Sequence, residues 1–102
     1  MAVRRDKTYF RKGVERVTRE ETLDAAKKCV CGDREQDYGN PEQNFELIAA
    51  LWSAYLGITI LPTDVPNMMM RVKQARTKTG HAKDDNWIDI AGYAACGAEL
   101  QG

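Results

Sequence analysis

The sequence predicts an all-α protein with four helices. Apolar residues recur at helical spacing in four segments, a residue suited to an N-cap precedes each of them, and almost no run alternates like a β-strand. Short links join the segments, which is typical of a helical bundle. At 102 residues the chain is expected to form one domain with a modest hydrophobic core.

The N-terminal residues lack clean periodicity, so we expect a basic tail or short helix at 1–17 and a single helical domain at 18–102. Five cations fall within the first dozen positions: Arg4, Arg5, Lys7, Arg11 and Lys12. A solvated tail and an arm that contacts phosphate groups both fit this run of charge.

The first helix is predicted over residues 18–31. Thr18 and Glu21 match a capping box, because each side chain can accept a hydrogen bond from a backbone N–H at the helix start. Gly32 is a natural end for this helix. Its inward positions are Leu23, Ala26 and Val30.

The second helix is expected to begin at Asn40 and Pro41, an N-cap followed by a proline at the first helical position, and to end at Gly57. One apolar stripe comprises Phe45, Ile48, Ala49 and Trp52. The stripe is widened by Leu47, Leu51 and Ala54. A stripe this wide predicts a helix that is buried on most sides.

The third helix is predicted from a cap at Thr63 to Gly80, with Pro66 tolerated in its first turn. Residues 58–61 form a short apolar connector before it. The positions expected to face inward are Val65, Met68, Met69, Val72 and Ala75.

The fourth helix is predicted over residues 86–100, after a cap at Asp84 or Asp85. Small residues recur in it every three or four positions, so another helix can approach closely, either within the chain or across a dimer. Glycine in a helix interior costs about 1 kcal/mol against alanine, so Gly92 and Gly97 indicate a packing need. We therefore expect a homo-oligomer that forms through this helix.

Composition excludes several kinds of partner and site. The net charge is zero, so no general attraction to nucleic acid is expected, and no apolar run approaches the about 20 residues that span a membrane. Three cysteines without a signal peptide predict a reduced, cytoplasmic protein. The pair Cys29 and Cys31, with His81 as the only histidine, does not supply the ligand spacing of a structural zinc site.

Asp89 is the most informative residue for chemistry. It is the only charged position between Asp85 and Glu99, in a segment that must be mostly buried, and a buried carboxylate needs a partner. Asp85 lies one helical turn earlier and can share its face. A structural role, such as a cap at Asp85 and an ion pair of Asp89 with a buried arginine, fits this pattern. A Mg²⁺ site or a contact to a bound nucleotide fits it as well.

The third helix supplies the opposite charge through Arg71, Lys73, Arg76 and Lys78. Lys73 and Arg76 share a face, which suits either a solvated basic surface or a clamp on phosphate oxygens. On the second helix, Glu42 and Glu46 stand four residues apart and could ligate a metal jointly or lie exposed.

The segment between the first two helices carries Arg34, Asp37 and Tyr38 beside the turn at Gly39. At a joint between helices these side chains can form the rim of a nucleotide pocket. Arg34 would contact phosphate, and Tyr38 would stack on a base or donate a hydrogen bond.

Four segments carry a family resemblance. They are Asp37-Tyr38-Gly39, NFELIAALWSAYLG, DVPNMMMRVKQARTKTG and DDNWIDIAGYAACGAEL. Over roughly residues 30–100 the chain resembles a small helical domain of uncharacterised function that is found mainly in tailed bacteriophages and prophages. The resemblance implies a location in the cytoplasm of an infected bacterial cell.

More distantly, the chain resembles the MazG-like NTP pyrophosphohydrolases, which implies a four-helix, usually oligomeric bundle that hydrolyses nucleoside triphosphates with Mg²⁺. Asp89 matches the aspartate of that family's Glu-x-x-Asp pattern, and Asn86 stands where its glutamate would be. On the preceding helix, Arg71, Lys73 and Arg76 stand in place of the family's Glu-x-x-Glu. Cations in place of carboxylates turn a metal site into a direct phosphate site.

These patterns predict a phage-type protein that binds a nucleotide phosphate, with hydrolysis of NTPs to NMP and pyrophosphate left open. The predicted catalytic residues are Asp89 and Asp85, the predicted Mg²⁺ ligands are Asp89, Asp85 and Glu46, and the predicted phosphate contacts are Arg34, Asp37, Tyr38, Lys73 and Arg76. One alternative is a non-catalytic protein that sequesters a small linear or cyclic nucleotide signal in phage counter-defence. A second alternative is a helical protein-interaction module.

Overall fold

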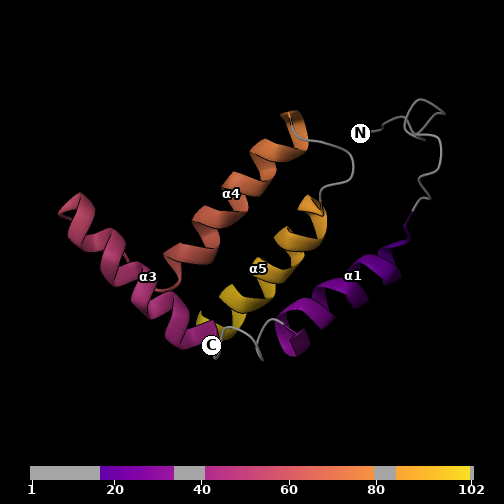
Figure 1. The fold of residues 1–102 in the computed structure, drawn as a ribbon, viewed down its shortest axis with the longest axis horizontal. Coiled ribbons are helices and arrows are strands. Elements are labelled where there is room, and N and C mark those ends of the chain that lie inside the picture. The colour runs from indigo at the N-terminus through magenta and orange to yellow at the C-terminus, as the bar shows by residue number, and fades with distance from the viewer. Residues whose placement is uncertain (1–16, 34–40, 80–84, 102) are drawn as a thin grey trace.

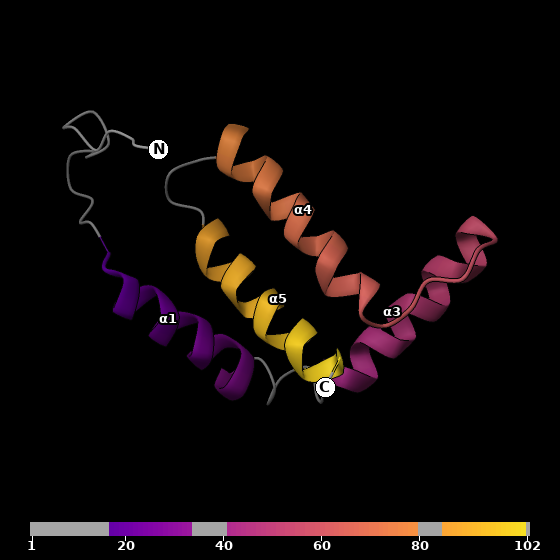
Figure 2. The same cartoon turned by 180° about the vertical axis from the view of Figure 1, so that it is seen from behind.

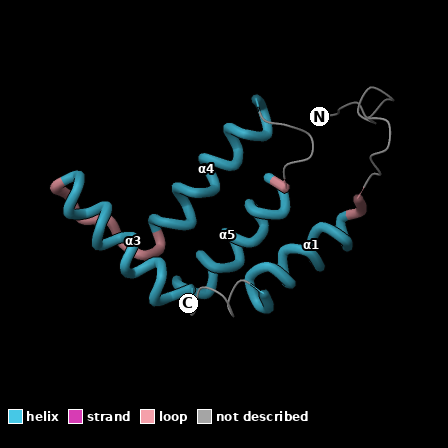
Figure 3. Tube along the Cα trace, viewed as in Figure 1, coloured by secondary structure: helices cyan, strands magenta, loops and turns pink. Residues whose placement is uncertain are grey.

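The structure, a computed structural model, describes residues 17–33, 41–79 and 85–101. Four α-helices lie in these ranges: α1 (Arg19–Lys28), α3 (Pro41–Leu56), α4 (Asp64–Thr79) and α5 (Asn86–Gln101). A π-helical turn, η2 (Cys29–Asp33), continues α1. No strand occurs within the described ranges (Figure 3), so the prediction of an all-α protein with four helices is confirmed. The MazG-like form of the bundle stays a prediction.

The helix α5 is central to the arrangement. It packs along α4 on one side and against α1 on the other, so these three helices form a layer (Figure 1). The view from behind shows the same order, with α3 crossing the end of the layer where α4 begins and α5 ends (Figure 2). One half of α3 therefore extends away from the other helices. None of the described helices is long and apolar enough to cross a bilayer.

The start of α1 follows the sequence prediction closely. The Thr18 backbone N–H donates to Glu21 Oε1 at 2.8 Å, and the Glu21 N–H donates to Thr18 Oγ1 at 3.0 Å. The capping box is thereby confirmed. The predicted end is wrong by a few residues. The helix α1 ends at Lys28, and Gly32 lies within the π-helical turn η2 that follows it.

The link between α3 and α4 is held by Ser53. The Ile60 N–H donates to Ser53 Oγ at 2.8 Å, and the Ser53 hydroxyl lies 3.3 Å from the Ile60 carbonyl oxygen. Gly57 ends α3 with a positive φ of 74°, a backbone conformation that glycine adopts without strain. At the start of α4, the carboxylate of Asp64 accepts from the Leu61 N–H at 2.8 Å. The predicted helix boundaries here are confirmed to within a residue.

The hydrophobic core lies where α3 crosses α4 and α5. Its buried members are Phe45, Ala49, Val65 and Cys96. Val65 is fully buried, and the Phe45 and Tyr93 rings lie 6.5 Å apart, centre to centre, in a tilted arrangement. Partly buried side chains surround them: Val30, Ile48, Trp52, Ile60, Met69, Tyr93 and Leu100.

Several residues that were predicted to face inward are exposed instead: Leu23, Leu47, Leu51, Ala54, Met68, Val72 and Ala75. The reason is geometric. The helices α1 and α4 each pack along one side of α5, and α3 packs on the end of this layer through one face, so the described residues leave the other apolar positions of these helices uncovered. The expectation that the second helix is buried on most sides is therefore wrong for a single chain.

The two glycines of α5 mark its closest contacts. A Cβ atom added at Gly92 would lie 3.1 Å from Cγ1 of Val30, whereas one added at Gly97 would lie 3.6 Å from Cγ of Pro66. The predicted close approach is thus found within the chain at Gly92, whereas Gly97 has ordinary van der Waals room. The predicted oligomer through this helix stays a prediction.

Because of these distances, Gly92→Leu is expected to lower the free energy of unfolding by about 1–3 kcal/mol, since the larger side chain overpacks the contact with Val30. Gly97→Ala is the matched control and should raise stability by about 0.5–1 kcal/mol, because its Cβ has ordinary space and alanine favours the helix. Urea denaturation followed by circular dichroism at one protein concentration measures both. A Gly92→Leu variant as stable as the wild type would contradict the packing described.

Ser53→Ala is expected to cost about 1–3 kcal/mol of stability, because it leaves the partly buried Ile60 N–H without its acceptor. Thr59→Ala, an exposed change in the same link, should alter stability by less than about 0.5 kcal/mol. The comparison uses the same denaturation measurement. Equal effects of the two substitutions would show that Ser53 does not hold the link.

Candidate functional site

Four polar side chains meet between α4 and α5, and we call them the polar cluster: Lys73, Arg76, Asn86 and Asp89. Lys73 and Arg76 stand three positions apart on α4, so they share a face; Asn86 and Asp89 do the same on α5. The two helices run antiparallel (Figure 1). Because of this direction, Lys73 lies opposite Asp89, and Arg76 lies opposite Asn86.

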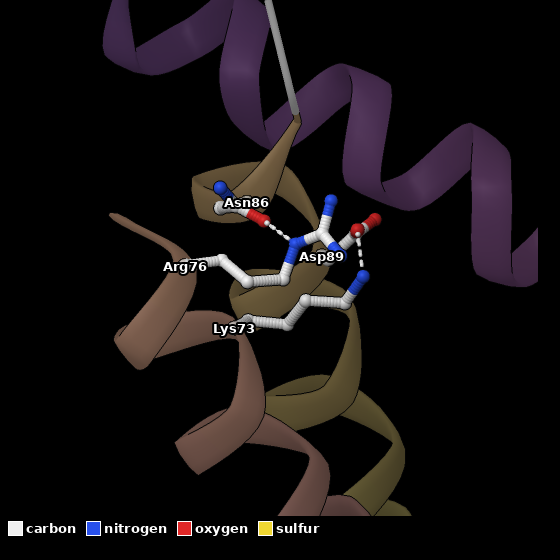
Figure 4. Close-up of polar contacts among 4 residues, drawn as sticks. All are labelled: Lys73, Arg76, Asn86 and Asp89. Atoms are coloured by element: carbon white, nitrogen blue, oxygen red, sulfur yellow. Dashed lines mark hydrogen bonds and ion pairs between the residues drawn. The ribbon is translucent and has the colours of Figure 1, made fainter. Parts of the chain in front are cut away.

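The contacts of the polar cluster are short and specific. Lys73 Nζ lies 2.9 Å from Asp89 Oδ2, and Arg76 Nε donates to Asn86 Oδ1 at 3.2 Å. Figure 4 shows both cationic side chains reaching from α4 toward the first turn of α5. The cluster therefore pins the N-terminal part of α5 to the C-terminal half of α4.

Burial differs across the polar cluster. Asn86 is 4% exposed, whereas the side chains of Lys73 and Asp89 are 20% and 33% exposed. A partly solvated ion pair of this kind contributes on the order of 1 kcal/mol to stability. Solvent therefore reaches both groups of the ion pair.

The prediction that Asp89 needs a partner is confirmed, and the partner is Lys73, whereas a structural hydrogen bond or a buried arginine was the structural alternative given by the sequence. The partner is Lys73 because the antiparallel packing of α4 and α5 brings Lys73 level with Asp89. Arg76 lies about one turn further along α4 and donates to Asn86. Sequence reasoning did not identify Asn86 as a partner of a cation. Its place three residues before Asp89 was the signal that could have revealed it.

Other predicted site residues stand apart from the polar cluster. Asp85 is exposed just before α5, where its carbonyl oxygen accepts from the Asp89 N–H at 2.8 Å. Glu46 is exposed on α3, and within the described ranges no ion pair or hydrogen bond joins it to the cluster. The predicted pocket rim, Arg34, Asp37 and Tyr38, lies outside the described residues.

The donor set for a metal is sparse in the part of the chain that the structure describes. No group of three or more histidine, cysteine, aspartate or glutamate side chains is placed there to hold an ion. Asp89 also has the Lys73 ammonium against Oδ2, so a metal would have to bind Oδ1 beside that cation or displace it. The described residues therefore do not fit a three-ligand site, although Mg²⁺ can be held by one or two carboxylates and water. The predicted Mg²⁺ stays a prediction.

Comparison with known proteins places the chain among phage sequences. The family described as "Domain of unknown function (DUF6378)" matches residues 21–101. The chain is 44% identical over 78 residues to the Gene 55 protein of Mycobacterium phage D29, covering 76% of this chain and 51% of that protein. It is 41% identical over 80 residues to the Gene 55 protein of Mycobacterium phage L5, covering 78% and 51%.

The chain thus spans about half the length of these two relatives. No solved structure matches the chain. The relatives support the prediction of a bacteriophage protein, and the name Gene 55 protein does not state an activity.

The ion pair can be tested by a double-mutant cycle. Lys73→Ala and Asp89→Ala are expected to show a coupling energy of about 0.5–1 kcal/mol in urea denaturation, falling in 1 M salt because the pair is partly solvated. The control cycle combines Lys78→Ala with Asp89→Ala. Lys78 is exposed on the same helix, so this cycle should give a coupling energy near zero. Equal coupling in both cycles would mean that the 2.9 Å contact contributes nothing specific.

Proposed function

The chain belongs to the DUF6378 family, and we propose that its polar cluster binds a phosphate group of a nucleotide. The observation that carries the proposal is the convergence of Lys73 and Arg76 beside Asp89, at a place that solvent reaches. Two cations on one face can surround a phosphate, the lysine as a point charge and the arginine through directed N–H groups.

The contacts indicate how a phosphate would be accepted. The Lys73 ammonium exchanges its Asp89 contact for an oxygen of the phosphate group. A terminal phosphate carries about −1.5 to −2 charges, and the phosphodiester of a cyclic nucleotide carries a single negative charge, as a carboxylate does. The bond from Arg76 Nε to the buried Asn86 fixes the plane of the guanidinium before the ligand arrives. This orientation lowers the entropy lost on binding.

Retention of an intact nucleotide fits the cluster better than hydrolysis. Pyrophosphohydrolysis of the MazG type, which the sequence resemblance implies, requires Mg²⁺ on carboxylates such as Asp89. Here Lys73 already neutralises that carboxylate. The polar cluster therefore supports a protein that sequesters a small linear or cyclic nucleotide, as a phage would use against a nucleotide signal, and catalysis is the alternative.

Thermal unfolding and calorimetric titration with a panel of NTPs, dNTPs and cyclic nucleotides, with and without Mg²⁺, test the proposal. At least one ligand should raise Tm, because binding to the folded state stabilises it by mass action. Lys73→Ala and Arg76→Ala should each weaken that binding by tenfold or more. Arg71→Ala is the matched control: Arg71 is exposed on the same helix, hydrogen-bonds to Asn67 and should leave the affinity unchanged.

The ligand recovered after binding distinguishes the two forms of the proposal. An unchanged nucleotide supports sequestration, whereas release of NMP and pyrophosphate in Mg²⁺, abolished by Asp89→Asn, supports hydrolysis. No stabilisation by any nucleotide, or equal loss of affinity in Arg71→Ala, would overturn binding at the polar cluster.

A protein-interaction module is the second candidate, because large apolar side chains are exposed over α3 and α4, among them Tyr55 at 87%. For that function Lys73→Ala and Arg76→Ala should leave partner binding intact.

A further inference from the structure

The helix α3 has two apolar faces. One face packs on the core through Phe45, Ile48, Ala49 and Trp52. The other, which we call the outer stripe, comprises Leu47, Ala50, Leu51, Ala54 and Tyr55. These positions follow the spacing i, i+3, i+4, i+7 and i+8, which places them on one side of a helix, roughly opposite the core face.

Every residue of the outer stripe is exposed in the single chain. The exposed fractions are 59% for Leu47, 60% for Leu51 and 87% for Tyr55. Other large apolar residues are also exposed at the end of α3 and in the link after it, namely Leu56, Ile58 and Leu61, but Leu56 lies on the core side of the helix by its spacing from Ala49 and Trp52. A helix that is apolar on all sides is normally buried on all sides, so the outer stripe lacks the cover that its sequence requires.

The chemistry of the stripe limits what can cover it. Residues 47–61 contain no charged side chain, so a partner that binds through ion pairs finds nothing to contact. A helix that lies on a lipid surface carries lysine or arginine beside its apolar face, whereas the charged residues of α3 are glutamates, Glu42 and Glu46. The partner must therefore present an uncharged, apolar face.

We propose that this partner is a second copy of the chain, with α3 packed against α3 through the outer stripe. A two-fold axis near Leu51 pairs the stripe with itself, so that Leu47 of each chain lies opposite Tyr55 of the other. Ala50 and Ala54 alternate with the larger residues and let the two helices approach to the usual 8–10 Å. The projecting half of α3 leaves room for this contact (Figures 1 and 2).

The area of the outer stripe is that of a small interface. A standard interface buries about 800 Å² on each partner. Leu47, Leu51 and Tyr55, each more than half exposed, supply part of such a surface together with the exposed Ala50 and Ala54. The small residues of α5 are less suited to the role, because Val30 and Pro66 already occupy the space beside Gly92 and Gly97.

Sedimentation velocity and light scattering on the full chain, across a range of concentrations, test the dimer. The wild type should show twice the mass of one chain, and its Tm should rise with concentration. Leu51→Glu and Tyr55→Asp should each give the mass of one chain and raise the dimer dissociation constant at least 100-fold. Because Tyr55 is 87% exposed in the single chain, Tyr55→Asp should keep the helical circular dichroism of the wild type.

Leu23→Glu is the matched control, since Leu23 on α1 is 62% exposed against 60% for Leu51. It should remain dimeric. A wild type that stays a single chain at high concentration would overturn the proposal. A wild-type dimer that is unaffected by both stripe variants would overturn it as well, since another surface would then form the contact. Neither result bears on nucleotide binding, which is measured by a different ligand titration.

Discussion

The packing of α5 against both of its neighbours sets the arrangement of the other helices. A side chain at Gly92 would press on Val30, whereas Gly97 leaves ordinary van der Waals room beside Pro66. Interiors of proteins tolerate little change in volume, so these contacts fix how far α1 and α4 stand from α5. The layer of three helices follows from them.

The polar cluster is a consequence of that layer. Once α4 and α5 lie antiparallel and close, the side chains three positions apart on each helix are brought level. Lys73 then meets Asp89, and Arg76 meets Asn86. Each contact alone is modest in energy, because the ion pair is partly solvated. Its importance is geometric, since the cluster holds two cations beside a carboxylate at a place that solvent reaches.

The helix α3 is not part of the layer but crosses its end. It closes the core at one end through Phe45 and Ala49, and the buried Val65 of α4 lies beneath it. The crossing covers one face of α3 and leaves the outer stripe in solvent. A chain of this length buries a limited share of its apolar surface, so association with a second copy is a direct way to cover the remainder.

The four helices and most of their ends could be predicted from the sequence, because these depend on neighbours within a few residues; the end of α1, which passes into η2, is the exception. Thr18 and Glu21, Gly57, and the start of α5 after Asp85 are local signals, and the structure follows them. The need of Asp89 for a partner was also readable, since a lone carboxylate in an apolar segment requires one. Tertiary structure alone decided that the partner is Lys73, that Asn86 receives Arg76, and that one apolar face of α3 is covered while the other is not. These outcomes depend on the register and crossing of helices far apart in the chain, which local periodicity does not encode.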